Sequence, residues 1–293
     1  MEYTNINTAS ELDSLVAKWT QNNVTSVAMD FEEESNLHCY GEHVCIIQLY
    51  DKTNYYILDC LELIKTQEGL QALKAFLEGP IEKVMFACQS DAALARKALK
   101  IQLKNIYDIR ILALALELTG NLTSIEETYL GQKESSEEAN ASKKRFQTAN
   151  WMRRPIPEAQ IQYALGDVQH LFELKQLLEH DVEKLPKAKK KEIQNALKTC
   201  AEPKHPERPG WEKICNFKML STQEKVFIKY YFLARDSVAK AHNVPASQVL
   251  AKQKIVAMAK EGTWKNEISC CNPAFYNELE KAMQQAQQRV DKK

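Results

Sequence analysis

Long apolar runs are missing from this sequence of 293 residues. No stretch approaches the ~18 consecutive apolar residues that a membrane-spanning helix needs, so no membrane association is expected. The first ten residues, MEYTNINTAS, have neither the basic start nor the apolar core of an export signal. We therefore expect a cytoplasmic protein.

Regular cysteine spacing is also missing, although the chain has eight cysteines. In a chain of this length without an export signal, irregular spacing favours reduced thiols over a disulfide framework. His38, Cys39, His43 and Cys45 supply zinc-type ligands, but the paired C-x-x-C spacing of structural zinc sites is absent. The alternatives here are a structural zinc and a hairpin that carries these side chains for other reasons.

Glycine is scarce, and the net charge is zero. The 8 glycines are typical of a helix-rich chain. Residues 1–185 carry 18 Lys+Arg and 28 Asp+Glu, a net of −10, whereas residues 186–293 carry 21 and 11, a net of +10. This division is typical of a metal-binding centre joined to a module that grips a polyanion. Two oppositely charged domains that dock on each other would show the same pattern.

Apolar and β-branched runs predict an α/β fold in the first part of the chain. Three runs predict an antiparallel meander, and the segments after it alternate between helix and strand. A meander followed by such alternation predicts a mixed sheet with helices on its faces. The predicted strands are 24–30, 43–50, 54–60, 82–87 and 104–107, and the predicted helices are 67–78, 90–100, 109–119 and 122–130.

The remaining sequence predicts a boundary between two domains. The stretch 131–146 has few large apolar residues and is expected to be a flexible excursion. A long helix over 158–183 then closes a first domain of residues 1–185. Lysines and prolines in 186–209 indicate a linker, and residues 210–293 are expected to form a second, all-helical domain.

Acidic residues follow two of the predicted strands. Asp30 and Glu32 are two positions apart, so on an extended segment both carboxylates point to the same side. Asp91 starts a helix just beyond the strand 82–87, at the strand edge where open α/β sheets place their sites. An exposed acidic strand end and an ordinary helix cap are the alternatives for these residues. Glu33 and Glu34 are expected to be exposed, and Asp108 to cap the following helix or to support the site.

Tyr163 and Asp167 are four positions apart on the last predicted helix, which places them one turn apart on one face. A helix that crosses the sheet edge would bring both to Asp30, Glu32 and Asp91, although a tyrosine at helical spacing can also be part of the core. Four converging carboxylates are ligands for two divalent cations such as Mg²⁺ or Mn²⁺, roughly 3.5–4 Å apart.

These motifs resemble ribonuclease D, in the tyrosine-bearing subclass of the DEDD exonuclease superfamily. Phe31 and Phe86 depart from residues that are common in the family, but no metal ligand is lost. The resemblance implies a ribonuclease H-like mixed-sheet domain, metal carboxylates at Asp30, Glu32, Asp91 and Asp167, and the catalytic tyrosine at Tyr163. The matching segments are DFE (30–32), FACQSDAAL (86–94), YDIRILALAL (107–116) and NWMRRPIPEAQIQYALGDVQHLFEL (150–174).

Residues 234–260 resemble the HRDC domain, a small all-helical module that binds nucleic acid. Basic residues of this part are expected to contact phosphates without reading sequence. The residues expected to do so are Lys225, Lys229, Lys240, Lys252 and Lys254.

The resemblance implies a 3′–5′ exoribonuclease that hydrolyses the 3′-terminal phosphodiester of RNA with two divalent metal ions, Mg²⁺ or Mn²⁺. Its products are nucleoside 5′-monophosphates, and the family suggests transfer RNA precursors with a free 3′ end as substrates. No protein partner is implied. The alternatives are a DNA-directed exonuclease of the same superfamily and a non-catalytic protein that binds nucleic acid.

Overall fold

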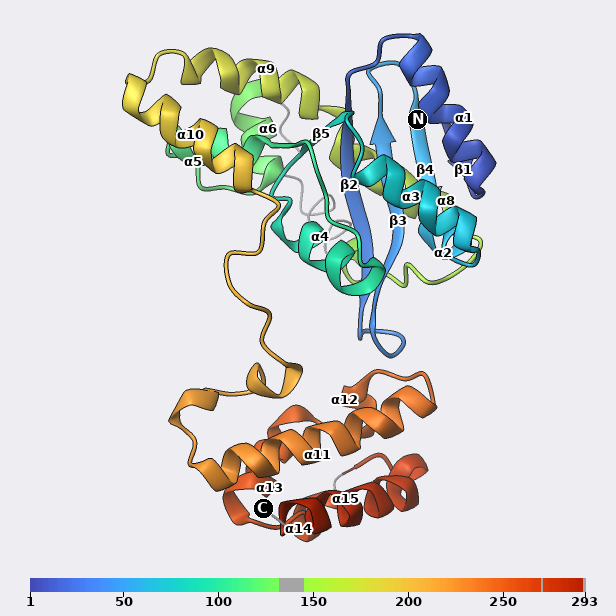
Figure 1. The fold of residues 1–293 in the computed structure, drawn as a ribbon, viewed down its shortest axis with the longest axis vertical. Coiled ribbons are helices and arrows are strands. Elements are labelled where there is room, and N and C mark those ends of the chain that lie inside the picture. Colours follow the sequence, from blue (N-terminus) through green and yellow to red (C-terminus); the bar gives the residue numbers. More distant parts are fainter. Residues whose placement is uncertain (132–144, 270, 292–293) are drawn as a thin grey trace. The chain divides into compact units, whose positions relative to one another are not determined.

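A computed structural model of the chain describes residues 1–131, 145–269 and 271–291, which form two compact units (Figure 1). The first unit comprises residues 1–33 and 43–203, and the second comprises 34–42 and 204–293. Most of the predicted excursion 131–146 lies outside the described residues. Within the described part of the chain, no helix is both long and apolar enough to span a membrane.

The first unit is built on a six-stranded sheet with the order β1-β4-β3-β2-β5-β6. Strand β3 pairs antiparallel with β4, whereas the pairs β1 with β4, β2 with β5 and β5 with β6 are parallel. The predicted mixed α/β class is therefore confirmed. The strands are β1 (Tyr3–Ile6), β2 (Ser26–Ser35), β3 (Glu42–Tyr50), β4 (Tyr55–Asp59), β5 (Glu82–Met85) and β6 (Ile106–Asp108).

Helices cover both faces of the sheet, so the central strands need apolar side chains on both sides. Val27 and Met29 of β2 pack in the cluster formed with α1 and α3, whereas Ala28 packs on the opposite face with α5 and α9. The first face carries α1 (Ala9–Gln21), α2 (Cys60–Leu63), α3 (Gln67–Leu77) and α4 (Gln89–Leu94), and the second carries α5 (Ile109–Ala115), α6 (Leu122–Leu130), α8 (Glu158–Gln169) and α9 (Leu171–Val182).

Strand β1 and helix α1 precede the predicted meander and were not predicted. Strand β1 has the sequence YTNI, which is too short and too polar to give a strand pattern, and its parallel pairing with β4 supplies its structure. Helix α1 begins with a capping box in which Thr8 and Glu11 satisfy each other's backbone groups. Trp19 of this helix is 1% exposed, and its ring packs nearly perpendicular to the Tyr56 ring with a centroid distance of 5.4 Å.

Two predicted helices differ from the observed ones. The predicted helix 158–183 is two helices, α8 and α9, which separate at His170. The predicted helix 90–100 ends its α-helical part at Leu94 and continues as a π-helical turn over Ala95–Leu99. No proline lies within either segment, and Gly166 lies inside α8, four residues before the break. The prediction of one helix over 158–183 was wrong, whereas the helix predicted over 90–100 agrees in extent with the helical residues 89–99 and differs only in its π-helical end.

Lys83 of β5 is fully buried on the face that carries α3. Its Nζ atom donates hydrogen bonds to the backbone oxygens of Gly79 at 3.0 Å and Lys104 at 3.1 Å. Burial disfavours the charged form and lowers the pKa of Lys83 from 10.5 to about 8. The lysine therefore couples the stability of the sheet to pH.

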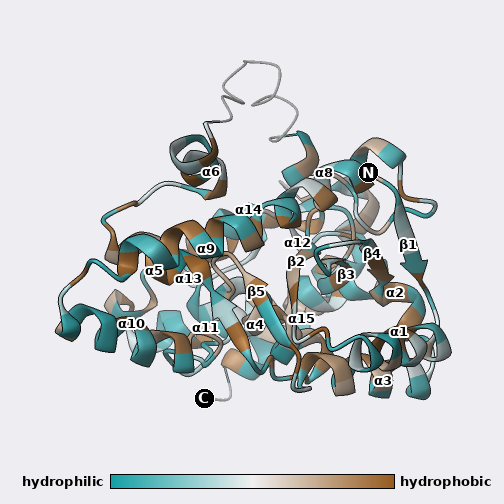
Figure 2. Cartoon of the chain, turned by 90° about the horizontal axis from the view of Figure 1, so that it is seen from above, coloured by the Kyte–Doolittle hydropathy of each residue, from teal (hydrophilic) through white to brown (hydrophobic). Residues whose placement is uncertain are grey.

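Helix α10 (Lys187–Thr199) falls within the predicted linker and packs against α5 and β6. It is coloured mainly as hydrophilic in Figure 2 and buries Ile193. The second unit is helical, with Tyr231 buried in its core. Its helices are α11 (Thr222–Ala241), α12 (Ala246–Val249), α13 (Lys252–Glu261), α14 (Lys265–Ile268) and α15 (Tyr276–Val290), with 3-10 turns at Gly210–Glu212, Phe217–Met219 and Pro273–Phe275.

Candidate active site

Strand β2 presents Asp30 and Glu32 on the sheet face that is covered by α8 and α9. The strand alternation explains this arrangement, since Ala28, two residues earlier, packs on that same face. Oxygen atoms of Asp30, Glu32 and Asp167 all lie within 4.8 Å of one another. The structure thus brings together three of the four carboxylates expected to converge, with Asp167 arriving from α8.

Asp91 lies in the first turn of α4, two residues after the helix begins at Gln89. The N-cap position is Cys88, so the alternative that Asp91 is the helix cap is wrong. Asp91 is close enough to Asp30 to be, after burial, the largest cause of the raised pKa of Asp30. The fourth carboxylate therefore belongs to the same electrostatic cluster.

Asp108 fixes the turn that leads from β5 to Asp91. Its two carboxylate oxygens accept hydrogen bonds from the backbone of Ala87 at 2.8 Å and of Cys88 at 3.1 Å, and it also caps α5 through the N–H of Arg110. The capping role foreseen for Asp108 is thus confirmed, and its other hydrogen bonds hold the turn before Asp91. Ala87 has a left-handed backbone with φ of 63°, which costs a non-glycine residue roughly 1–2 kcal/mol. The Asp108 hydrogen bonds offset this strain and end β5 two residues before the predicted boundary.

Tyr163 and Asp167 lie one turn apart on α8, and their side chains are hydrogen-bonded. The Phe146 ring stacks on the Tyr163 ring with a centroid distance of 5.2 Å. The tyrosine therefore points to the carboxylates with its hydroxyl while its ring rests on another aromatic side chain. The expectation that this tyrosine faces the carboxylates agrees with this geometry.

Residues just before α8 anchor that helix to the sheet. Trp151 is 2% exposed and packs with Ile46 of β3 and Ile161 of α8. Arg154 Nη2 donates to Asp59 Oδ1, at the end of β4, at 2.8 Å and to the Cys45 backbone oxygen at 3.1 Å. A guanidinium fork can hold a carboxylate and backbone oxygens together, so α8 is fixed relative to β3 and β4.

Asp30, Glu32 and Asp91 hold their protons more tightly than ordinary carboxylates. Burial, followed by the nearby Asp91 and Asp167, raises the pKa of Asp30 well above its usual value. Burial and the same two neighbours also raise the pKa of Glu32. The pKa of Asp91 rises to about 7, mainly through burial and then through the charge of Glu33. Ionising several neighbouring carboxyl groups in a desolvated site is therefore costly in free energy.

This excess of negative charge fits divalent metal ions. The charged groups that act on Asp30 and Glu32 are other carboxylates, and carboxylate oxygens are the ligands that Mg²⁺ and Mn²⁺ prefer. Among the described residues, the Asp30, Glu32 and Asp167 group is the one set of three or more His, Cys, Asp or Glu side chains close enough to share an ion. The zinc alternative at residues 38–45 therefore finds no support.

Two residues near the cluster behave differently from expectation or were missed. Glu34 was expected to be exposed but is 1% exposed, since its carboxylate accepts the backbone N–H of His38 at 3.0 Å and contacts His38 Nδ1 at 2.8 Å. Gln48 of β3 was not predicted, although it is fully buried and donates from Nε2 to Asp30 Oδ2 at 2.8 Å. A polar residue within the apolar run CIIQLY is the signal that could have identified it.

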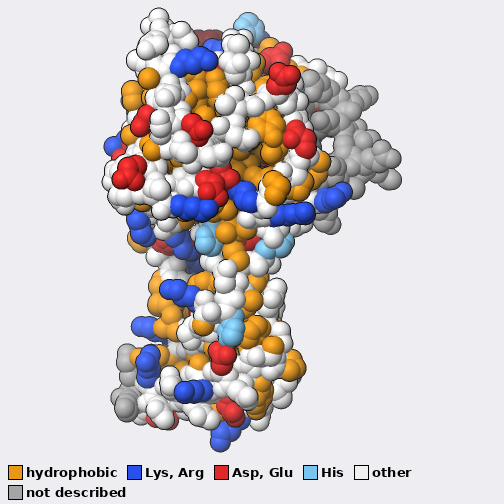
Figure 3. All heavy atoms as spheres, turned by 90° about the vertical axis from the view of Figure 1, so that its right-hand side faces the viewer, with side chains coloured by type: hydrophobic (Ala, Val, Ile, Leu, Met, Phe, Trp, Pro, Cys, Tyr) orange, Lys and Arg blue, Asp and Glu red, His pale blue; other side chains and the backbone are white. Residues whose placement is uncertain are grey.

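The lysines expected to contact nucleic acid lie in different surroundings in the second unit. Lys240 and Lys252 are exposed, whereas Lys254 forms an ion pair with Glu267 at 2.6 Å. Lys225 and Lys229 are half-buried, and Lys229 lies over the Trp211 ring at 5.4 Å. Figure 3 displays Lys and Arg side chains at several separate points on the lower, C-terminal part.

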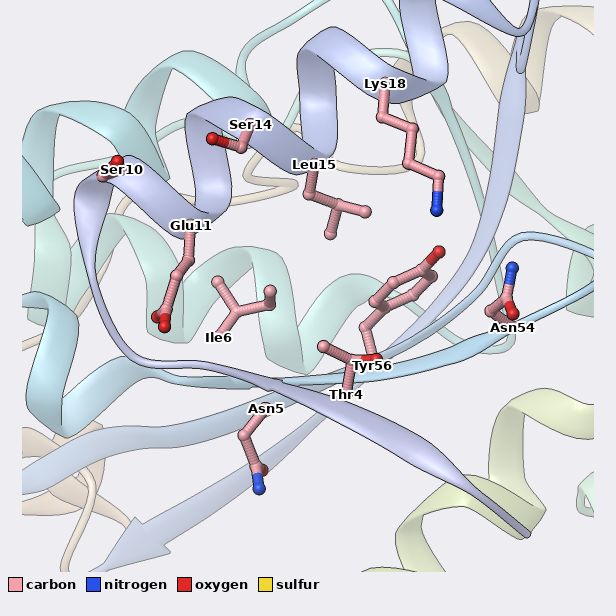
Figure 4. Close-up of a pocket in the computed structure, with 10 residues that line it drawn as sticks. All are labelled: Thr4, Asn5, Ile6, Ser10, Glu11, Ser14, Leu15, Lys18, Asn54 and Tyr56. Atoms are coloured by element: carbon pink, nitrogen blue, oxygen red, sulfur yellow. The ribbon is translucent and has the colours of Figure 1, made fainter.

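A hollow of about 400 Å³ lies between α1 and the edge of the sheet formed by β1 and β4 (Figure 4). None of the four carboxylates lines it. Two of its polar groups serve the fold, since Glu11 belongs to the capping box of α1 and the Tyr56 hydroxyl donates to Asp51 at 2.8 Å. We therefore place the candidate active site at the carboxylates.

The geometry is that of an acidic cluster on the face of the sheet, whose oxygen atoms are of the kind that coordinates divalent cations. Residues 3–183 match the family model described as 3'-5' exonuclease. Because this match covers more than half of the chain, the protein belongs to the 3'-5' exonuclease family.

Individual relatives agree with this assignment. Ribonuclease D of Nitrobacter hamburgensis is 25% identical to this chain, and the alignment covers 84% of this chain and 61% of that protein. Exosome complex component 10 of Mus musculus is 26% identical, and the alignment covers 89% of this chain and 30% of that protein. The chain thus spans between about a third and three fifths of these relatives. The crystal structure of Escherichia coli RNase D has a TM-score of 0.72 at 22% identity, covers 99% of this chain and 76% of its own, and shares the fold.

Proposed function

We propose that this chain is a metal-dependent 3′–5′ exoribonuclease that hydrolyses the 3′-terminal phosphodiester of RNA and releases nucleoside 5′-monophosphates. The observation that carries the proposal is the carboxylate cluster of Asp30, Glu32 and Asp167 in a chain of the 3'-5' exonuclease family. Phosphodiester hydrolysis depends mainly on stabilising negative charge and on positioning the attacking water. A buried acidic cluster that binds cations meets the first requirement.

Asp30, Glu32, Asp91 and Asp167 would hold two divalent cations, Mg²⁺ or Mn²⁺. When bound, such cations supply Lewis acidity, which lowers the pKa of water and neutralises charge on the leaving 3′ oxygen. The chain itself contributes a fixed arrangement of oxygen ligands from β2, α4 and α8. Asp108 contributes indirectly, because it fixes the turn before Asp91.

Tyr163 is assigned to orienting the attacking water. Burial, followed by the charges of Asp167 and Glu32, raises the pKa of its hydroxyl in the metal-free protein. A phenol that keeps its proton can donate one hydrogen bond and accept another, but it is a poor proton acceptor. The proposed role of Tyr163 is therefore to hold the water by hydrogen bonds and not to remove its proton.

RNA is the proposed substrate because relatives named ribonuclease D and exosome complex component 10 align with most of this chain. Transfer RNA precursors and other small structured RNAs with a free 3′ end are the proposed natural substrates, and the cytoplasm is the proposed location. The HRDC-like residues 210–293 are proposed to hold the RNA through phosphate contacts, with the exposed Lys240 and Lys252 as the first candidates.

The test is digestion of a 3′-extended, structured RNA by the full chain with Mg²⁺ or Mn²⁺, with and without chelator, followed by identification of the product. We expect nucleoside 5′-monophosphates and complete inhibition by chelator. Asp167→Asn should lose nearly all hydrolysis because an amide replaces an anionic ligand, and Tyr163→Phe should bind Mn²⁺ normally but cut about 10²-fold more slowly. The exposed Asp13→Asn is the control.

The outcomes separate the alternatives. Parental rates for both Asp167→Asn and Tyr163→Phe would overturn the site assignment. Faster digestion of a DNA of the same sequence would make the protein a DNA exonuclease, since the 2′-hydroxyl is what distinguishes the two substrates. RNA binding without any metal-dependent hydrolysis would leave the non-catalytic alternative.

A further inference from the structure

Gln48 is a buried polar residue for which the fold offers no structural reason. It lies in the middle of β3, where it pairs with Ile57 of β4 and is flanked by the buried residues Ile47 and Leu49. The residue is 0% exposed. Burying an amide costs about 1–3 kcal/mol unless its hydrogen bonds are made, so an apolar side chain is the ordinary choice at such a position.

The amide of Gln48 faces the carboxylate cluster. Nε2 donates to Asp30 Oδ2 at 2.8 Å, which suits the ionised form of Asp30 that binds a cation, because that form only accepts hydrogen bonds. The same side chain also hydrogen-bonds to the side chain of Glu32. The two N–H bonds of one amide are thus shared between two neighbouring carboxylates.

The carbonyl end of Gln48 is also informative. Oε1 is buried and accepts no hydrogen bond from the described residues. Such an orphaned acceptor is unusual in a folded core and indicates that the side chain is held in place by its amide end. The position of Gln48 is therefore set by the two carboxylates and not by its own backbone surroundings.

A neutral donor suits a cluster that binds cations. A lysine or arginine at this place would neutralise Asp30 and Glu32 and would compete with a divalent ion for their oxygens. An apolar residue would leave two like charges to repel each other and to rotate apart. The amide orients both carboxylates and leaves their negative charge intact.

We propose that Gln48 is a positioning residue that holds Asp30 and Glu32 in the orientation that binds divalent metal. The inference rests on the proposed function, in that the bound metal is the one used for hydrolysis. Residues that hydrogen-bond to metal ligands typically change metal affinity by about 10–100-fold when they are removed. Gln48 should therefore act on metal affinity first and on the rate of hydrolysis as a consequence.

The test compares Mn²⁺ binding by calorimetry to the full chain and to Gln48→Met, which keeps the length of the side chain and removes its donors. We expect the Kd for Mn²⁺ to rise about 10–100-fold while the variant remains folded. The matched control is Gln160→Met, because Gln160 is also buried but donates to the backbone oxygen of Asn150. Its Kd should stay at the parental value.

The unsubstituted protein supplies a second measurement that does not depend on a variant folding. With ¹⁵N-labelled glutamine, the Gln48 side-chain NH₂ resonances should shift during a Mg²⁺ titration and saturate together with metal binding. Resonances that do not move, or a parental Kd in folded Gln48→Met, would overturn the inference. Absence of Mn²⁺ binding by the unsubstituted chain would instead overturn the proposed function, so the two failures are distinguishable.

Discussion

The metal-free carboxylate cluster should make the protein less stable as pH rises, and Asp91 gives this effect a magnitude. In the unfolded chain its pKa is the ordinary 3.8, whereas in the folded protein it is about 7. Between these values the folded state holds a proton that the unfolded state has released, so the free energy of unfolding falls as pH increases. Below pH 4 the effect is absent, and above pH 7 it is complete.

Each pKa unit corresponds to about 1.4 kcal/mol, so ionising Asp91 should cost the folded protein about 4 kcal/mol relative to the unfolded chain. Asp30 and Glu32 add to the same trend because their pKa values are also raised. A divalent cation that binds the folded state should restore stability at pH 8, by an amount that grows with its concentration.

The assay is urea denaturation in EDTA at pH 4.5, 6 and 8, repeated with Mn²⁺ at pH 8. Relative to the parent, Asp91→Asn should gain about 3 kcal/mol of stability on going from pH 4.5 to 8, because part of the total effect is already present at pH 4.5. Asp13→Asn, on the exposed face of α1, should follow the parent. If the free energy of unfolding depended on pH identically in the parent and in Asp91→Asn, the conclusion that ionising Asp91 destabilises the folded protein would be refuted.

Two further predictions concern other charged residues. Because the pKa of Lys83 is lowered, the folded lysine is neutral between pH 8 and 10.5, whereas the unfolded lysine is still charged. The free energy of unfolding should therefore rise by roughly 3 kcal/mol over this range. In Lys83→Met this rise should vanish, and denaturation curves that keep it would contradict the lowered pKa. Replacing Lys240 and Lys252 together by alanine should lower the slope of log affinity for single-stranded RNA against log salt by about 1.4, or ~0.7 for each lost phosphate contact. Lys18→Ala in the first unit is the control and should leave the slope unchanged. Filter binding at several salt concentrations measures the slopes, and equal slopes would exclude phosphate contacts by the two lysines.

The parts of the fold that local patterns encode were predictable. Apolar runs with β-branched residues identified the meander, and the gap between the predicted strands 43–50 and 54–60 is a turn in which Asp51 accepts hydrogen bonds from Thr53 and Asn54. Strand β1 was missed because only its pairing with β4 defines it. The break at His170 was missed because no proline marks it and because Gly166, four residues earlier, lies inside α8 without ending the helix.

The candidate site was predictable to the extent that spacing on one element determines it. Asp30 with Glu32, and Tyr163 with Asp167, follow from strand and helix periodicity. Gln48 could not be assigned in this way, because its contact with Asp30 depends on β2 and β3 being neighbours in the sheet. Glu34 was misjudged for a similar reason, since its burial depends on the backbone folding back at His38.

The carboxylate cluster draws on three elements that are distant in the chain, and its last member, Asp167, lies in α8, more than a hundred residues after Asp30. During synthesis, a ribosome-bound chain that has released β2 and α4 still lacks this ligand. The chain should thus be unable to cut nucleic acid until α8 has emerged and docked on the sheet. Late completion of the cluster would prevent the incomplete protein from hydrolysing the messenger RNA and the RNA of the ribosome during synthesis.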